Sequence, residues 1–429
     1  KEVFKLQPGS LLTINKTGQY IKSTNWFNFA SEVKKSKSNF KQYNEKKLHE
    51  ILRIAVKEQM VSDVPIGCLL SGGVDSSLIT SIMQEHSKNK INTFTIGFSD
   101  DHYNEATYAK KISKILNTQH HELYVKPKMA IDLISKLPKI YDEPFGDSSK
   151  IPTILVSQLA SKNVKVCLSG DGGDELFGGY NRYIWSNIIF KLFKNSVYLK
   201  SLFSNLLSKI STNNWNEFYK IFSLLISQRF RVNNFGDKIH KISEVINFKS
   251  EEDLYIKLIS QWRSDLPTNH NFNEILSFQK KLNWNKNVNF IENMMISDTL
   301  NYLPDDILVK VDRASMSTSL ETRAPFLDIR VIKEAWGIPL NEKIKKKSGK
   351  LPLKNILSKY LPSELIDRPK QGFGVPIDSW LRTSLKDWAE DLLDQKKIES
   401  GLYFDSKAVR KIWQDHLTGK RNWQYPLWN

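Results

Sequence analysis

Two glycine-rich turns constrain this chain most, because each follows directly on a short apolar run. The first, Ser71–Ser77 (SGGVDSS), comes after IGCLL, and the second, Ser169–Glu175 (SGDGGDE), comes after VKVCL. An apolar run that ends in glycines and opens a helix is a strand-to-helix turn, whose backbone N–H groups can hold an anion. The first turn has neither the Gly-Lys-Ser/Thr ending of a Walker loop nor the G-x-G-x-x-G spacing of a dinucleotide fold. Both turns therefore predict anion sites of another type.

Each turn also carries an aspartate just past its glycines, Asp75 in the first and Asp174 in the second. Two carboxylates that converge on one crevice can hold Mg²⁺ against a polyphosphate. Taken alone, Asp75 is equally well explained as an acid at a helix N-terminus, where the helix dipole favours negative charge. The matched place of Asp174 after the second run favours the metal.

Strand-like and helix-like segments alternate around these turns. We expect strands at 67–70, 93–97, 121–125 and 164–168, with helices from residue 74 and at 105–116, 130–140 and 152–162. Such alternation predicts an α/β fold with a doubly wound parallel sheet. Ligands of these sheets bind beyond the carboxyl ends of the strands, where both turns lie.

The segments outside this alternation predict other structures. Residues 183 to about 300 carry apolar residues at helical spacing, so we expect an appended all-helical region with Trp185, Trp262 and Trp284 in its core. Residues 4–26 predict a strand, a turn and a second strand, and the polar segment 34–41 predicts a linker. His120 and His121 have no partner at zinc spacing and are interpreted as structural.

Five motifs in the right order carry a resemblance to a known family. They are SGGVDSS at Ser71–Ser77, SGDGGDELFGGY at Ser169–Tyr180, KVDRASMSTSLETRAPFLD at Lys310–Asp328, GKLPLK at Gly349–Lys354 and RPKQGF at Arg368–Phe373. The first loop resembles that of the ATP-pyrophosphatase (PP-loop) superfamily, whose fold is adenine nucleotide alpha hydrolase-like. The second and third motifs make the chain most similar to the synthetase half of the glutamine-dependent asparagine synthetases.

The resemblance implies ATP and Mg²⁺ as cofactors, and it implies roles for individual residues. The two metal ligands are Asp75 and Asp174, and Lys350 neutralises phosphate in the adenylation transition state. Asp171 faces the acceptor or ammonia, although the common family form has the longer glutamate there. The remaining nucleotide-binding positions are the first loop, its flanking strand residues and one glycine of the second loop: Leu69, Ser71, Gly72, Gly73, Ser76, Ser77, Ile96 and Gly170.

Several of these positions have a plainer explanation that stays open. Leu69 and Ile96, which match adenine contacts, are also ordinary strand core, and Lys350 is also a lysine in a basic run. Arg313, Glu321, Arg323 and Asp328 also fit a structural ion-pair network, which we favour for Asp328.

The loop at 141–149 is expected to face the acceptor. One form of the family has an arginine here that meets the aspartate carboxylate, whereas this chain has Asp147. A cation for an acceptor carboxylate must then come from elsewhere in the chain.

Composition and charge bear on whether the protein binds nucleic acid or a membrane. The formal charge of +17 permits nucleic-acid binding, but the lysines are scattered, as at Lys34, Lys37 and Lys41, and we expect solvated faces and no nucleic acid. Two cysteines in strand-like runs fit a reducing compartment, and no apolar stretch is long enough to span a bilayer, so we expect a cytoplasmic protein without a membrane partner.

We expect residues 1–31 to be the C-terminal remnant of an N-terminal glutaminase domain plus a linker, and 32–429 to be the ATP-binding domain with a helical insertion at about 183–300. The expected reaction is ATP-dependent amidation of a carboxylate through an acyl-adenylate, with aspartate to asparagine leading. The partners are small molecules and the glutaminase domain of a longer chain, and a homodimer is left open. Alternative reactions are amidation of a uronic-acid sugar and closure of a β-lactam ring. A further alternative is a tRNA-modifying PP-loop enzyme, which would require catalytic cysteines near the loop.

Overall fold

A five-stranded sheet with all strands parallel is the larger of the two described sheets. The computed structural model describes residues 5–429 apart from 101–103, 195–196, 224–234, 263–265, 269–281, 283, 286, 346–347 and 369–373. The strand order is β5-β4-β3-β6-β7. The strands are β3 (Ile66–Leu69), β4 (Asn92–Phe98), β5 (Gln119–Val125), β6 (Val166–Leu168) and β7 (Glu321–Arg323). The four strands expected from the sequence are present, and β7 is an addition.

The strand order reverses between β3 and β6. From β3 the chain moves outward through β4 to β5, and it then returns to lay β6 along the other side of β3, with Cys68 opposite Leu168. The helices that follow these strands are α3 (Val74–His86), α4 (Ala106–Ile115), α5 (Pro127–Ile134), α6 (Leu137–Tyr141), α7 (Lys150–Ala160) and α8 (Gly173–Phe177). Because β3 and β6 are adjacent and parallel, both glycine-rich turns leave the sheet at the same edge.

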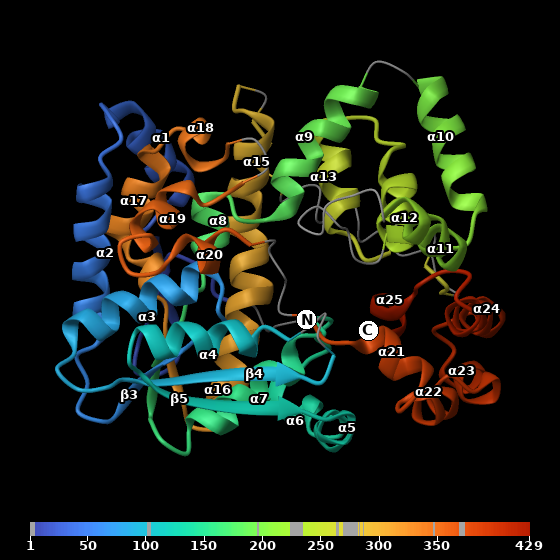
Figure 1. The fold of residues 1–429 in the computed structure, drawn as a ribbon, viewed down its shortest axis with the longest axis horizontal. Coiled ribbons are helices and arrows are strands. Elements are labelled where there is room, and N and C mark those ends of the chain that lie inside the picture. Colours follow the sequence, from blue (N-terminus) through green and yellow to red (C-terminus); the bar gives the residue numbers. More distant parts are fainter. Residues whose placement is uncertain are drawn as a thin grey trace.

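Two separate cores pack against the sheet. Adjacent residues of β6 enter different cores, Leu168 the one that contains α3 and α4, and Cys167 the one that contains α7. This is expected because successive side chains of a strand point to opposite faces. In Figure 1 the strands β3, β4 and β5 lie at the lower left with α3 and α4 alongside them.

The N-terminal segment contains a hairpin and two helices, α1 (Phe29–Asn39) and α2 (Glu45–Gln59). Strands β1 (Ser10–Ile14) and β2 (Tyr20–Asn25) pair antiparallel in a sheet of their own, as the turn signals indicated. The linker expected at 34–41 is wrong, because residues up to Asn39 belong to α1. Asn28 caps this helix, and Phe29 packs edge-on against Trp336 with ring centroids 5.6 Å apart. Only Phe29 and Val33 are buried in α1, so its polar sequence is that of a helix with one narrow apolar face.

The region from 181 to 316 is helical in its described part, as predicted. Its elements are α9 (Asn181–Phe193), α10 (Val197–Lys209), α11 (Thr212–Ser223), α12 (Phe235–Val245), α13 (Glu251–Ile259), α15 (Phe290–Ser297), the π-helix η2 (Asp298–Leu308) and α16 (Val309–Met316). Trp284 and Trp262 pack against other aromatic rings. Trp185 is half exposed, so its assignment to the core is wrong. On α9 the chain has other apolar residues to bury, and Tyr183 and Ile189 fill the core positions.

The C-terminal part packs against both cores of the sheet and also contacts the helical region. The 3₁₀ turn η3 (Pro325–Leu327), α17 (Ile329–Gly337), α18 (Leu340–Lys343), α19 (Leu351–Leu357) and α20 (Ser363–Ile366) return to the sheet beside α1 and α2 (Figure 1). The last helices are α21 (Ile377–Arg382), α22 (Lys386–Leu392), α23 (Gln395–Gly401), α24 (Ser406–Leu417) and α25 (Gln424–Trp428), and they join the helical region through the bond from Thr212 Oγ1 to the Gly419 carbonyl. Among the described residues, no helix combines the length and apolarity that a membrane span requires.

Candidate functional site

The two glycine-rich turns touch one another at the edge of the sheet. A Cβ placed on Gly170 would lie 2.8 Å from the backbone nitrogen of Ser76 and 2.9 Å from the Cβ of Asp75. Any residue larger than glycine at 170 would therefore push the second turn away from the start of α3. The contact brings the two predicted anion-binding turns into one site, as the sequence indicated.

Hydroxyl groups fix the shape of the first turn. Ser71 Oγ lies 3.0 Å from Ser76 Oγ, which also accepts from the Ser71 backbone N–H at 3.2 Å. The Gly73 N–H donates to Ser71 Oγ at 3.3 Å. Gly72 has a φ of +81°, a backbone conformation that is strained for residues with a side chain. Ser77 is buried, and no described residue bonds its hydroxyl. Helix α3 has Gly73 as its N-cap and no side-chain cap, so its N-terminus faces the site with its dipole.

Asp75, Asp174 and Lys350 meet in front of these turns. Lys350 Nζ lies 2.7 Å from Asp174 Oδ1 and forms a second ion pair with Asp75 Oδ2. The lysine is buried, with 6% of its surface exposed. Burial alone would lower its pKa, but the Asp174 and Asp75 carboxylates outweigh burial and raise the pKa of Lys350 above its ordinary range. The three groups singled out from distant motifs thus form one charged cluster.

Close backbone contacts place Lys350 between the two carboxylates. Its N–H donates to the Phe177 carbonyl at the end of α8 at 3.1 Å, and its φ is +58°, a conformation that lysine rarely adopts. A Cβ on Gly179 would collide with both Asp174 and Lys350. The glycines of the second motif therefore leave the space in which the lysine lies.

Asp75 and Asp174 are suited to hold Mg²⁺. One or two carboxylates, with phosphates and water as the other ligands, are the usual protein share of such a site. Within the described residues, no group of three His, Cys, Asp or Glu side chains is arranged as a metal site. In this structure Lys350 is the counter-ion of both carboxylates.

Asp171 lies in the second turn, three residues before Asp174. Its Oδ2 accepts a hydrogen bond from Ser169 Oγ at 2.7 Å. Burial raises its pKa, and the hydrogen bond from Ser169 and the charge of Lys310 oppose that effect. The buried site therefore favours the ionised form of Asp171 less than water does.

A second charged cluster lies beside Asp171, and the sequence did not indicate it. Lys310 Nζ lies 2.6 Å from Asp147 Oδ2, and both side chains are largely buried. Asp306 is next to this pair, and burial and the Asp147 charge raise its pKa to about 7. Lys310 opens the third motif, but nothing in the local sequence pairs it with a loop that precedes it by 163 positions.

Leu69 and Ile96, the positions expected to contact adenine, lie on adjacent strands. Leu69 pairs in register with Phe94, and Ile96 lies two residues further along β4. Ile96 is buried in the core that contains α7, and Leu69 packs against the same core. Their role toward a nucleotide stays a prediction.

The charged residues of the third motif hold elements together. Asp328 caps α17 and pairs with Arg330, which also contacts Glu58 of α2. Arg323 donates to the carbonyls of Gln59 and Val61. These contacts agree with the structural interpretation of Asp328 and extend it to Arg323.

Arg368 connects the last motif to the first turn. Its Nη2 donates to the Gly72 carbonyl at 2.5 Å, and its guanidinium lies over the Tyr108 ring, 4.2 Å from the centroid. The rest of that motif, residues 369–373, lies outside the described residues. The motif alone predicts no role for Arg368, and its contact with the Gly72 carbonyl places it beside the first turn.

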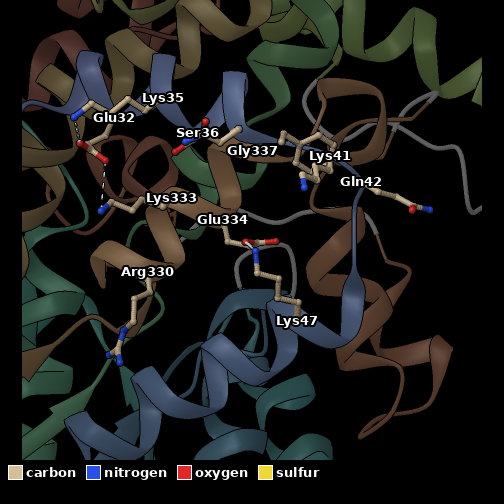
Figure 2. Close-up of a pocket in the computed structure, with 12 residues that line it drawn as sticks. Glu32, Lys35, Ser36, Lys41, Gln42, Lys47, Arg330, Lys333, Glu334 and Gly337 are labelled. Atoms are coloured by element: carbon tan, nitrogen blue, oxygen red, sulfur yellow. Dashed lines mark hydrogen bonds and ion pairs between the residues drawn. The ribbon is translucent and has the colours of Figure 1, made fainter.

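A cavity of about 590 Å³ lies elsewhere, between α1 and α17 (Figure 2). Figure 2 shows Lys35 and Lys333 directed at Glu32 and Lys47 directed at Glu334, with distances of 3.2, 3.6 and 2.6 Å between charged atoms. None of its lining residues belongs to the glycine-rich turns. We interpret it as a solvated groove lined by ion pairs.

The cysteines and the paired histidines belong to the sheet. Cys68 and Cys167 are buried and unpaired, and burial raises the pKa of the Cys68 thiol to about 12. His120 bonds Thr93 at 2.9 Å, and His121 stacks on Phe94. The structural interpretation of the histidines agrees with these contacts.

The parallel α/β sheet, with two glycine-rich turns in contact at one edge, agrees with the PP-loop class that the first motif resembles. A match to the asparagine synthase family covers residues 47–429, and the chain belongs to that family.

Curated relatives agree. The chain is 29% identical over 99% of its length to asparagine synthetase (glutamine-hydrolyzing) 1 of Bacillus subtilis, and covers 63% of that protein. It is 30% identical over 88% of its length to a putative asparagine synthetase of Mycobacterium bovis and covers 55% of it. Against putative asparagine synthetase 2 of Methanocaldococcus jannaschii it is 37% identical over 64% of its length, covering 50%. It thus spans between half and two thirds of these relatives' length.

Proposed function

We propose that this chain activates a carboxylate with ATP to form an acyl-adenylate and pyrophosphate, and that ammonia then displaces AMP to give an amide. Aspartate to asparagine is the leading reaction. The observation that carries the proposal is the position of Lys350 between Asp75 and Asp174, in contact with both glycine-rich turns. The reversal of strand order between β3 and β6, with a core against each face, supports a doubly wound sheet of the adenine nucleotide alpha hydrolase type.

The first step requires that the β and γ phosphates be held while negative charge moves onto them. Backbone N–H groups and hydroxyls of Ser71–Ser77 suit this task, because they lie at the N-terminus of α3. Lys350 is buried and charged, so it contributes strongly in a site with little water. Mg²⁺ held by Asp75 and Asp174 would neutralise part of the phosphate charge. Leu69 and Ile96 would pack against adenine.

The second step requires that a proton leave the attacking nitrogen. Asp171 is the residue of this chain that we assign to that side of the site, because it lies in the turn that carries Asp174 but is directed to Ser169 and toward Lys310. Its shorter side chain, compared with glutamate, calls for a closer approach of the acceptor.

The ammonia source belongs to the longer protein. The relatives' names include glutamine hydrolysis. We infer that a glutaminase domain precedes this chain and that residues 1–31 are its end. That domain would pass ammonia to the ATP-binding domain, residues 32–429, which contains the helical insertion. Cys68 and Cys167 are both buried in β-strands with raised pKa values, so neither suits thiolate attack on glutamine. Buried, unpaired cysteines also fit the reducing cytoplasm, where we place the protein.

The alternatives make different demands on the site. A tRNA thiolase needs a reactive thiol near the loop, and the burial of both cysteines disfavours it. A uronic-acid acceptor stays the main alternative within the same chemistry.

Acceptor-dependent formation of AMP and pyrophosphate, measured with a panel of carboxylic acids and ammonium salt, tests the proposal. We expect stoichiometric AMP, pyrophosphate and amide with at least one acid. Formation of ADP and phosphate in their place, or no turnover with any acid, would contradict it.

A further inference from the structure

One face of a continuous helical segment carries three polar residues that interact with Asp147 of the loop at 142–149. Tyr302, Asp306 and Lys310 follow one another at spacings of four residues along η2 and α16. Asp147 of the loop meets this face, since it bonds Lys310 at 2.6 Å and interacts with Asp306. The segment and the loop are therefore joined by charged groups.

The two oxygens of Asp147 have different tasks. Oδ1 accepts from the backbone N–H and the hydroxyl of Ser149, both at 2.8 Å, and so shapes its own loop. Oδ2 accepts from Lys310. A lysine ammonium has three N–H donors, so Asp147 uses only one of them. The bond between Oδ2 and Lys310 can be exchanged without disturbing the loop.

This ion pair is buried, and it lies beside the proposed reaction centre. Lys310 is 8% exposed, and burial alone would lower its pKa, but Asp147, Asp306 and Asp171 outweigh burial and raise it. Asp171 belongs to the second glycine-rich turn, which touches Asp75. A molecule that reacts next to Asp171 is therefore within reach of both Lys310 and Asp147.

We propose that Asp147 and Lys310 form an exchangeable ion pair that selects the acceptor, with Lys310 binding a non-reacting carboxylate and Asp147 binding an ammonium group of the same molecule. The inference rests on the proposed function and names its acceptor class, an α-amino acid with a second, reacting carboxylate.

The reason is electrostatic. Separating a buried ion pair is costly unless both charges find new partners. An acceptor with a non-reacting carboxylate and an ammonium supplies both partners at once. The ion pair between Asp147 and Lys310 is then replaced by two ion pairs with the acceptor. An acceptor with only one of these groups leaves Lys310 or Asp147 uncompensated. A uronic-acid sugar has neither group beyond its reacting carboxylate, and it has nothing to exchange for the pair.

Four acceptors separate these cases. Aspartate has both groups, 3-aminopropanoate lacks the non-reacting carboxylate, succinate lacks the ammonium, and glucuronate lacks both in this sense. Pyrophosphate release with ATP and ammonium measures kcat/KM for each acid. We expect the wild type to favour aspartate over each of the others by roughly 100-fold, the order expected for one unpaired buried charge.

Variants assign the discrimination to the pair. Lys310→Met should raise the KM for aspartate much more than it lowers kcat, because the contact is to a group that does not react. It should also bring the kcat/KM values for aspartate and 3-aminopropanoate to within about 10-fold of one another. Asp147→Asn should likewise bring the kcat/KM values for aspartate and succinate close together. Lys310→Arg keeps the positive charge and should keep most of the preference for aspartate over 3-aminopropanoate. Lys333→Met, an exposed lysine of α17, is the matched control and should change nothing.

The double variant Asp147→Asn with Lys310→Met removes both charges of the pair and replaces either single variant that fails to fold. An unchanged order of acceptors in folded Lys310→Met, or in the double variant, would overturn the inference, as would a wild type that prefers glucuronate. Both results leave pyrophosphate release intact, whereas failure of the proposed function would abolish it with every acid.

Discussion

Lys350 Nζ lies 2.7 Å from Asp174 Oδ1 and also pairs with Asp75, so one ammonium neutralises a carboxylate from each glycine-rich turn. The cation that the proposed chemistry requires at the phosphates is thus already held where two aspartates can exchange it for a metal. The first two predictions follow from this arrangement.

Asp75→Asn and Asp174→Asn should each reduce acceptor-dependent pyrophosphate release by roughly 100-fold or more, because each removes a charge from a step dominated by electrostatics. Steady-state pyrophosphate release at saturating Mg²⁺ measures the loss. Asp132→Asn, in an exposed position on α5, is the matched control. Near-normal turnover in either site variant would exclude the metal-binding role of that aspartate.

Lys350→Ala should lower kcat more than it raises the KM for ATP, as expected for a contact made chiefly in the transition state. The variant also leaves Asp75 and Asp174 without their shared cation, and loss of a buried partner costs about 3 kcal/mol of unfolding free energy. Mg²⁺ should therefore raise the melting temperature of the variant more than that of the wild type. An equal Mg²⁺ effect on both proteins would show that the two carboxylates do not share the metal.

Gly170→Ala should impair turnover while the protein still folds. The added Cβ would meet Ser76 N at 2.8 Å, so the two turns must separate, at a cost of about 1–3 kcal/mol. Circular dichroism and pyrophosphate release on the same preparation compare fold and function. Gly401→Ala is the control, because its added Cβ would meet no atom within 4 Å. A Gly170→Ala enzyme with full activity would contradict the close packing of the turns.

Glu175→Gln should stabilise the protein at high pH. Burial, together with the Asp174 charge, raises the pKa of Glu175 to about 7 from an ordinary 4.5. The folded state keeps a proton that the unfolded chain releases, so this group's contribution to stability is present below pH 4.5 and is lost as the pH rises through 7. Glutamine keeps an oxygen that can accept the Tyr180 hydroxyl.

Denaturant unfolding at several pH values measures this effect. At pH 8 the Glu175→Gln variant should exceed the wild type by on the order of 3 kcal/mol, and near pH 4.5 the two should agree. Glu364→Gln, at an exposed position, should leave the pH profile unchanged. A constant difference at all pH values would refute the titration of Glu175.

The two thiols should be inert in the folded chain. Cys68 and Cys167 are buried, and burial raises their pKa values. We expect neither to react with a disulfide reagent at pH 8 until guanidinium unfolds the protein.

In the same preparation, ammonium should support amide formation, whereas glutamine should release no glutamate that depends on either cysteine. Glutamate release abolished by Cys68→Ala would overturn the assignment of glutamine hydrolysis to a separate domain.

The sequence predicted those parts of the fold that have a local signal. Apolar runs before glycines predicted β3 and β6, and alternation predicted the parallel sheet. Strand β7 was missed because its three residues, Glu321–Arg323, include no apolar run, and only pairing with β6 makes them a strand. The helix α1 was missed because tertiary contacts at Phe29 and Val33, not its polar face, decide its structure.

The site divides in the same way. Asp75 and Asp174 could be paired in advance, because matched turns after parallel strands lie at one edge of a sheet. Lys350 could be added only through the resemblance, and the structure places it in contact with both aspartates. Asp147 and Lys310 could not be paired, since their contact depends on how a loop and a distant helix pack.

The strand order has a consequence for how the protein is made. Strand β6 inserts beside β3 only after the intervening β4 and β5 have been synthesised, and Lys350 emerges from the ribosome later than every strand of the sheet. Contacts so distant along the chain form late in folding. A nascent chain therefore carries two mutually repelling carboxylates, Asp75 and Asp174, until Lys350 arrives, so this charged cluster is complete only after every strand of the sheet has been synthesised.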